Sequence, residues 1–241
     1  MSEKYTCKIG GHQFFEIKLK ESVFRPTGTS DEIIKAVSTN IDVPGKMLDL
    51  GCGSGVVGFA MHFLGKSQGP LYASDLSIEA TLLIEENGED LGIPVVARHG
   101  SIFSPWENEF FDYIIDDVSG ISEEVAAISP WFDKTSCRSG KDGSDLVIEA
   151  ITNAPHHLNK GGKFFFPVLS LSNSNKIIEA ANETFANVQK ISHKEWLLPD
   201  ELKLHMDILV DLRSQGLIHF EEKYGWFLWS TDIYMADSPW F

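Results

Sequence analysis

The chain has few of the residues that form covalent or metal cross-links. Its 241 residues include three cysteines, Cys7, Cys52 and Cys137. Disulfide frameworks and zinc sites use cysteines in even numbers or at close, regular spacings, and these three show neither feature. The sequence therefore predicts no disulfide framework and no metal site, and it favours a reducing compartment.

Long apolar runs are also missing. Nowhere do about 18 apolar residues follow one another, which is the length that a membrane-spanning helix needs. Residues 1–5, Met-Ser-Glu-Lys-Tyr, do not begin the apolar core of a signal peptide. We therefore expect a soluble, cytoplasmic protein that makes no membrane contact.

Positive charge is scarce. The chain has 20 lysines and arginines against 35 aspartates and glutamates, which gives a net charge of -15, and no run of like charge accounts for it. An acidic field repels a polyanion, so the charge makes nucleic acid an unfavoured partner. A local basic groove remains compatible with these numbers.

What the chain does have is enough apolar material for one large core. Its hydrophobic residues amount to 43% of the sequence, and the length suits one α/β domain with additions better than two domains. We expect a single domain over 1–241, with an N-terminal part at 1–42 and a core at 43–241. The first part contains a hairpin around Gly10-Gly11, from Thr6 to Leu19, and a helix from Asp31 to Asn40 with a capping box between Thr29 and Glu32.

The stretch around which the core is organised is Met47-Leu48-Asp49-Leu50-Gly51-Cys52-Gly53-Ser54-Gly55. A short apolar run ends in alternating glycines, and an apolar helical pattern follows through Leu64, so the stretch predicts a strand, a tight turn and a helix. Glycines let the turn approach a ligand closely, and the unpaired N–H groups of the helix favour a negatively charged ligand group.

Two ligand classes suit such a turn. Gly53, Gly55 and Gly58 satisfy the dinucleotide pattern G-x-G-x-x-G, and Asp75 stands at a suitable distance to hold a ribose. Asp49 argues against a dinucleotide, because its carboxylate would face the pyrophosphate, whereas it would suit the ammonium group of S-adenosylmethionine. A nucleotide-binding or cofactor-free Rossmann domain is the alternative.

The stretch from Asp49 to Gly55 resembles the cofactor loop of class I S-adenosylmethionine-dependent methyltransferases. The resemblance implies a Rossmann-like fold with a seven-stranded, mostly parallel sheet and helices on both faces. It extends over roughly Phe24 to Val168 and is nearest in pattern to the release-factor glutamine methyltransferases. By this resemblance, the segment with Arg25, Thr27 and Thr29 lies over the cofactor, and the predicted cofactor-binding residues are Asp49, Gly51, Gly53, Gly55, Asp75, Leu76, Ser101, Ile102, Asp116 and Thr29.

Two strand ends carry the remaining cofactor contacts. Asp75 ends a strand from Leu71 and can accept both ribose hydroxyls, although it could instead only cap the helix that follows. After the strand at 94–98, Ser101 stands where many relatives have an acid that binds the adenine amine. We therefore expect the adenine contact to use Ser101, its backbone and the apolar Ile102 and Phe103.

The acceptor motif departs from the family. Where flat-amine methyltransferases have Asn-Pro-Pro-Tyr or Asp-Pro-Pro-Tyr, this chain has Asp117-Val118-Ser119-Gly120 after the strand at 111–115, so the stacking ring is missing. Asp116 and Asp117 are the candidate catalytic residues, because either could take a proton from the acceptor or orient it. Both could equally hold the cofactor or cap a helix.

The C-terminal part adds a helical insertion at about 197–224, before the last strand at 225–235. A single helix from Asp200 to Gln215 is expected, with Leu202, Met206, Leu209 and Arg213 on one face and Gly216 as its stop. The aromatic residues gathered here should mostly lie in the core, and some could line an acceptor pocket. They are Trp196, Trp226, Trp229, Tyr234 and Trp240.

These features predict an S-adenosylmethionine-dependent methyltransferase that acts on a peptide or protein acceptor by O- or N-methylation other than the flat-amine type. A small-molecule acceptor and a catalytically silent cofactor-binding module are the alternatives, and nucleic acid is disfavoured by charge. The paired histidines at 156–157 are expected to end a helix rather than to bind a metal.

Overall fold

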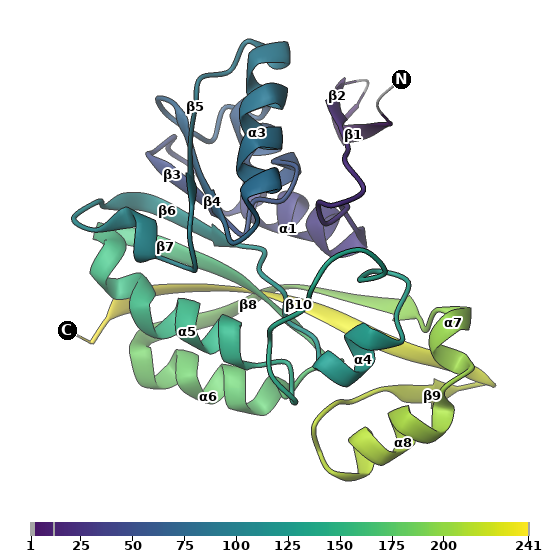
Figure 1. Ribbon diagram of the computed structural model, residues 1–241. Helices are drawn as coiled ribbons and strands as arrows, with labels where there is room; N and C mark the ends of the chain where they lie inside the picture. Colours follow the sequence, from purple (N-terminus) through teal and green to yellow (C-terminus); the bar gives the residue numbers. More distant parts are fainter. Residues whose placement is uncertain (1–2, 12, 241) are drawn as a thin grey trace.

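The computed structural model describes residues 3–11 and 13–240. Within them, seven strands cross the main sheet in the order β5-β4-β3-β6-β7-β10-β8, and a short eighth strand, β9, pairs with β10. Strands β3 to β7 are parallel, whereas β10 runs antiparallel to its neighbours (Figure 1). The predicted sheet is confirmed, with β9 as an addition. The strands are β3 (Met47–Leu50), β4 (Leu71–Asp75), β5 (Val95–His99), β6 (Phe111–Asp116), β7 (Leu158–Leu169), β8 (Phe185–Leu197), β9 (Glu221–Lys223) and β10 (Trp226–Pro239).

Alternate residues of the central strands face two apolar layers. Ile115 and Phe165 pack into one core cluster, whereas their neighbours Ile114 and Phe164 pack into another. Successive side chains of a strand point to opposite faces, so both layers need apolar residues and the strands are apolar throughout. One layer contains the helices α1 (Gly28–Thr39), α2 (Val56–Phe63) and α3 (Ile78–Leu91). The other contains α5 (Asp145–Asn153), α6 (Ser174–Thr184) and the 3-10 turns η1 (Ser104–Trp106) and η2 (Ala154–His157).

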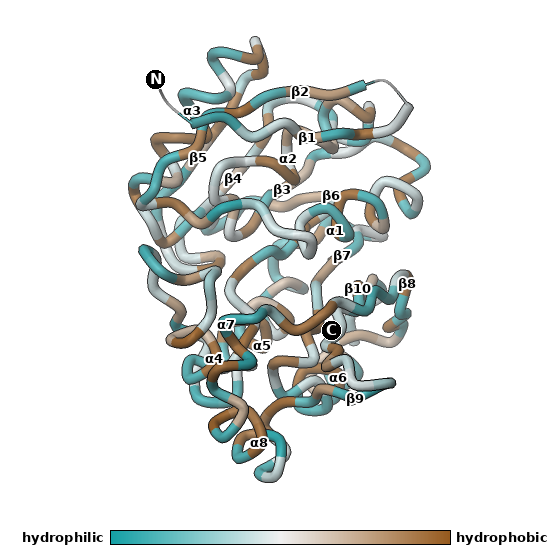
Figure 2. Tube along the Cα trace, turned by 90° about the vertical axis from the view of Figure 1, so that its right-hand side faces the viewer, coloured by the Kyte–Doolittle hydropathy of each residue, from teal (hydrophilic) through white to brown (hydrophobic). Residues whose placement is uncertain are grey.

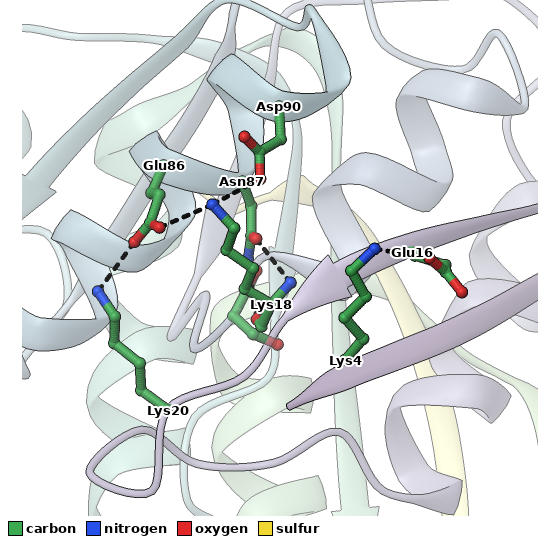
Figure 3. Close-up of polar contacts among 8 residues, drawn as sticks. Lys4, Glu16, Lys18, Lys20, Glu86, Asn87 and Asp90 are labelled. Atoms are coloured by element: carbon green, nitrogen blue, oxygen red, sulfur yellow. Dashed lines mark hydrogen bonds and ion pairs between the residues drawn. The ribbon is translucent and has the colours of Figure 1, made fainter. Parts of the chain in front are cut away.

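The predicted N-terminal hairpin is present as β1 (Lys4–Gly10) and β2 (Gln13–Lys18). Asn87 of α3, which is 1% exposed, joins this hairpin to the core. Its Oδ1 accepts the Lys18 N–H at 2.8 Å, and its Nδ2 donates to the carbonyls of Lys18 and Ser54. Lys18 also forms ion pairs with Glu86 and Asp90 (Figure 3). Asn87 therefore connects the hairpin, α3 and the glycine loop.

A third core cluster lies under the helical insertion, at the end of the molecule opposite the hairpin (Figure 2). The predicted single helix is two helices, α7 (Asp200–Lys203) and α8 (Met206–Ser214), because the chain turns at Leu204, whose side chain is exposed. Leu212 fills the core where Arg213 was expected, and the Arg213 guanidinium lies 4.4 Å from the centre of the Phe220 ring. Another short helix, α4 (Glu123–Ala127), was not predicted.

One further local prediction was wrong. Helix α1 begins at Gly28, not Asp31, and its capping box is formed by Thr27 and Ser30. Strand β7 runs through Gly161-Gly162, where its pairing with β6 shifts register between Leu158 and Lys163 and Gly161 has a φ of 79°. Of the C-terminal aromatic residues, Trp229 and Tyr234 are buried and Trp196 is partly buried, as expected for most of them, whereas Trp226 and Trp240 are 56% and 65% exposed. Across the described residues, no helix has the length and apolar character needed to cross a bilayer.

Candidate active site

A cavity of about 580 Å³ opens at the carboxyl ends of β3, β4 and β6, beside the segment that leads into α1. Ligands bind in open parallel sheets at this edge, where the strand order reverses. We call the part lined within 50–56, 74–80 and 100–102 the glycine-loop side. The part lined within 117–121, 131–138 and 196–197 and by Trp229 is the tryptophan side.

Close backbone approach requires glycine at two positions of the loop after β3. A Cβ on Gly51 would lie 2.9 Å from the Val118 backbone nitrogen, and one on Gly55 would lie 2.5 Å from Ile84 Cγ1. Both residues also have positive φ angles, 76° and 86°. Gly51 and Gly53 line the cavity, whereas Gly55 packs against α3 behind it.

Asp49 does not line the cavity, contrary to its predicted place beside the cofactor ammonium. Its side chain is fully buried, and its Oδ2 accepts the Gly58 N–H at the start of α2 at 2.9 Å. Its Oδ1 has no hydrogen-bond partner within residues 3–11 and 13–240. Burial raises the pKa of Asp49 to about 7, against the lowering effect of the Gly58 hydrogen bond. Asp49 therefore holds the helix start against β3.

Asp75 lies in the wall at the end of β4, as predicted. Its Oδ2 accepts the Gly53 N–H at 2.9 Å, and its Oδ1 accepts the Ser77 N–H at 2.8 Å. Burial raises the pKa of Asp75, and these hydrogen bonds oppose the shift. The residue that caps α3 is Ser77, whose hydroxyl accepts the Ala80 N–H. Asp75 thus fixes the glycine loop and presents its carboxyl group to the cavity.

Leu76, Ser101 and Ile102, which are predicted to bind the cofactor, also line the glycine-loop side, whereas Phe103 is not among the lining residues. Ile102 has a φ of 47°, in the left-handed region that β-branched residues rarely adopt, and its side chain is 6% exposed. Such strain persists only where the surroundings enforce it, and it is common at binding sites. The loop after β5 is therefore held in one shape against the cavity.

The two candidate catalytic carboxyl groups differ in placement. Asp116 is fully buried behind the wall, and its Oδ1 accepts the Val118 N–H at 3.2 Å. Its Oδ2 finds no partner in the described part of the chain, and burial raises its pKa to about 8. Asp117 lines the cavity and accepts the Ser30 hydroxyl at 3.0 Å, and burial raises its pKa well above the ordinary value. Of the pair, Asp117 is thus the one that can meet a ligand.

The start of α1 covers the cavity, as predicted for the segment before the core. Thr27 and Thr29 line it, but Arg25 turns away to Glu3, with a 2.7 Å hydrogen bond. The Thr29 hydroxyl is 3.3 Å from that of Thr231 on β10. Thr231 also accepts the Trp196 indole N–H at 3.1 Å, so one chain of hydrogen bonds joins α1 to the tryptophan side.

Three tryptophans form the wall of the tryptophan side. Trp196 and Trp229 are paired residues of β8 and β10, with ring centres 6.2 Å apart, and the Trp131 ring lies 5.3 Å from that of Trp229. A Cβ on Gly28 would lie 2.6 Å from the Trp196 ring, so the start of α1 packs directly on it. Of the helical insertion, only Leu197 among the described residues reaches the cavity. The insertion packs behind this wall, in one apolar cluster with Trp229, rather than forming the wall.

Sequence reasoning missed the connection between α4 and α5. Trp131, Phe132, Lys134, Thr135 and Arg138 all line the cavity from this segment. An aromatic pair and two cations close together in an acidic chain were the available signal. No periodic pattern marks such a segment, because its position depends on packing against β8 and β10.

The residues of the glycine-loop side fit a polar adenosine-type cofactor. The hydroxyls of Ser54 and Ser74 are buried in the wall and have no hydrogen-bond partner in the structure as described. Buried polar groups are normally paired, so these two indicate a polar ligand. A Cβ on Gly53 would lie 3.4 Å from the Phe24 carbonyl, so the segment before α1 lies close to the glycine loop.

Known proteins match the chain in the same region. The model of the family "Methyltransferase small domain" matches residues 26–117. Release factor glutamine methyltransferases from Enterococcus faecalis and Geobacter sulfurreducens are 26% and 28% identical to this chain, over 66% and 64% of its length. The matches span 58% and 56% of those two proteins, so the chain corresponds to little more than half of their length.

Solved structures agree on the architecture. The T. thermophilus 16S rRNA N2 G1207 methyltransferase, determined with AdoMet and guanosine, superposes with a TM-score of 0.64 at 14% identity, over 98% of this chain and 50% of that one. The ribosomal protein L11 methylase of Lactobacillus delbrueckii subsp. bulgaricus superposes with a TM-score of 0.52 at 17% identity, over 89% of this chain and 83% of that one. The fold is that of a class I methyltransferase. The predicted fold is therefore confirmed, and the methyltransferase family model matches the part of the chain that holds the glycine loop and the ends of β4 and β6.

Proposed function

We propose that this chain transfers a methyl group from S-adenosylmethionine to a peptide or protein acceptor. The observation that carries the proposal is one continuous cavity that joins the glycine loop and Asp75 to the Asp117 carboxyl group and an aromatic wall. A transferase needs both halves in one space, because its cofactor and its acceptor must meet.

On the glycine-loop side, Asp75 would accept the ribose hydroxyls, and the main chain at Gly51 and Gly53 would lie against the cofactor. Ser101, Ile102 and Leu76 would surround the adenine, and Thr29 would cover the cofactor from α1. Ser54 and Ser74 would supply the remaining polar contacts. When bound, the cofactor supplies a sulfonium methyl group that is already reactive.

Alignment is the main contribution of the protein to such a reaction, because the acceptor atom must stand about 3 Å from the methyl carbon with its lone pair directed at it. Asp117 is placed to orient the acceptor or to take its proton. Its raised pKa makes the group a stronger base once ionised, and the Ser30 hydroxyl fixes the direction of the carboxyl group. Asp116 would act only indirectly, through the backbone of Val118.

The acceptor class is supported from two sides. The names of the curated relatives favour a protein acceptor. Val118, Ser119 and Gly120 lack the ring that clamps a flat amide or base, so we expect no transfer to the glutamine of a release factor. A small-molecule acceptor is the second candidate, because the three tryptophans enclose an apolar space suited to a compact ligand. A cytoplasmic location belongs to the same proposal.

Cofactor binding can be tested with Asp75→Ala. Loss of the carboxyl group leaves the ribose hydroxyls and the Gly53 N–H unpaired, so affinity for S-adenosylhomocysteine should fall by about 1–3 kcal/mol, or five-fold to more than a hundred-fold. Isothermal titration calorimetry measures the change. Glu85→Ala, which removes an exposed acid from the same helix that Asp75 precedes, serves as the control. Equal affinity of Asp75→Ala and the natural chain would contradict the assignment.

The acceptor can be found with labelled S-adenosylmethionine and the peptide, metabolite and RNA fractions of a cell extract. We expect label in the peptide fraction, and its loss with Asp117→Asn while S-adenosylhomocysteine still binds. Label in the metabolite fraction would favour the second candidate. Strong methylation of a release-factor glutamine would overturn the argument from Val118, Ser119 and Gly120.

A further inference from the structure

The tryptophan side holds hydrogen-bond donors that methyl transfer itself does not use. Arg138, an exposed residue, lines the cavity, and its guanidinium has neither a hydrogen bond nor an ion pair with any residue of 3–11 or 13–240. The Trp229 indole nitrogen and the Thr135 hydroxyl are buried without a partner in the same described residues. A guanidinium and an indole N–H can only donate, so what they lack is an acceptor.

Charge in this part of the wall is also unbalanced. Its other cation, Lys134, is paired with Glu21 at 2.8 Å, which leaves Arg138 uncompensated. The two carboxyl groups in the wall are Asp75, on the glycine-loop side, and Asp117. The Asp117 carboxyl group accepts the Ser30 hydroxyl at 3.0 Å and forms no ion pair with Arg138 among the described residues. In a chain with a net charge of -15, a free cation at a cavity mouth is a local exception.

Apolar surface surrounds these donors. The Trp131 and Trp229 rings lie 5.3 Å apart, and Phe24 lies 4.9 Å from Phe132, with all four rings in the wall. The tryptophan side therefore combines a planar, charged guanidinium with surrounding aromatic rings.

We propose that Arg138 binds a carboxylate of the acceptor, and that this carboxylate stands next to a ring or another compact apolar group. A guanidinium matches the two oxygens of a carboxylate with two parallel N–H donors, and the tryptophan side takes the apolar neighbour. The proposal depends on the proposed function, because it assigns the tryptophan side to the acceptor. It makes Arg138 a specificity-determining residue rather than a catalytic one.

The cofactor has a carboxylate of its own, but the anchoring of Arg138 places it elsewhere. The neighbours of Arg138 are tied to the loop after β6: the Ser139 hydroxyl donates to the Ser119 carbonyl at 2.6 Å, and the Cys137 thiol donates to the Ile121 carbonyl at 3.6 Å. This loop continues from Asp117 away from the glycine loop. Arg138 is thus held on the acceptor half.

Matched probes test the proposal. N-acetyl-phenylalanine and N-acetyl-phenylalaninamide differ only in the carboxylate, and their binding is followed by calorimetry and by the fluorescence of the tryptophan wall. The chain is kept saturated with S-adenosylhomocysteine, so that the probes cannot enter the cofactor half. We expect the acid to bind about tenfold more tightly than the amide, as for a charge-assisted bidentate pair.

Three variants separate the effect of the guanidinium from that of a positive charge alone and from that of a distant cation. They are Arg138→Gln, Arg138→Lys and Lys160→Gln. Arg138→Gln should remove the preference for the acid, and Arg138→Lys should keep part of it. Lys160→Gln, which removes an exposed cation outside the wall, should change nothing. Equal binding of acid and amide to the natural chain, or an unchanged preference in Arg138→Gln, would overturn the proposal. A loss of S-adenosylhomocysteine affinity in Arg138→Gln would also overturn it, by assigning Arg138 to the cofactor. If S-adenosylhomocysteine does not bind the natural chain, the proposed function fails, and the probe pair without it still tests Arg138.

Discussion

At the scale of single residues, burial separates the acids of the site into two pairs. Asp49 and Asp116 are fully buried, with pKa values raised to about 7 and about 8 by loss of hydration. Asp75 and Asp117 lie in the wall and can meet ligands. The first pair fixes backbone N–H groups at two strand ends, and the second pair is available for chemistry.

Asp116→Asn should reduce the pH dependence of stability. The folded pKa of about 8 lies above the ordinary value of about 3.9 for an unfolded chain, so between these values the folded state keeps a proton that the unfolded state releases. Stability from this group is complete below the unfolded pKa and is lost as pH rises through the folded pKa. The slope is at most about 1.4 kcal/mol per pH unit.

Urea unfolding of the ligand-free protein at pH 5, 6.5 and 8 measures this effect. The natural chain should lose stability across the series, and Asp116→Asn should lose less. Asp133→Asn, at an exposed acid, is the control. If the free energy of unfolding changes with pH equally in Asp116→Asn and in the natural chain, the carboxyl group ionises freely in the folded state.

At the scale of elements, the helical insertion supports the tryptophan side. Leu202, Leu209 and Leu212 are fully buried, in one cluster with Val125 of α4 and with Trp229. Helices α7 and α8 of the insertion lie near α4 and β9 (Figure 1). The tryptophan side therefore depends on a segment of which, among the described residues, only Leu197 lines the cavity.

Leu209→Ala should destabilise the fold by about 2–5 kcal/mol, because it removes buried methyl groups and leaves a void. Val210→Ala is the matched control, since Val210 is 45% exposed and lies on the same helix. Chemical unfolding gives both values, and titration with S-adenosylhomocysteine should show unchanged affinity in the folded variant. If Leu209→Ala lowers the free energy of unfolding less than Val210→Ala does, the insertion packs loosely.

At the scale of the whole molecule, acidic charge dominates, although some similar structures belong to RNA methyltransferases. Binding to a nucleic acid backbone requires lysines and arginines that neutralise phosphates. We expect short labelled RNA and duplex DNA to bind more weakly than about 0.1 mM at physiological salt. Fluorescence anisotropy measures this, and micromolar binding that weakens steeply with salt would contradict the expectation.

Local sequence determined the elements around the glycine loop. The strand at Met47, the loop through Gly55 and the strand from Leu71 to Asp75 were predicted at their observed positions, because apolar runs and glycines act over a few residues. The same local signals placed Asp75 and Asp117 at strand ends, and strand ends meet at one edge of a parallel sheet. The candidate site was therefore located from the sequence.

Tertiary structure alone decided which atoms face the cavity. Asp49 and Asp75 each stand at or near the end of a strand, yet Asp49 turns toward Gly58 and Asp75 toward the ligand space. Trp131 joined the site because its ring packs against Trp229 of β10, and Arg138 because its neighbours are hydrogen-bonded to the loop after β6. Such contacts depend on how whole elements fill a shared core, and no pattern of neighbouring residues encodes them.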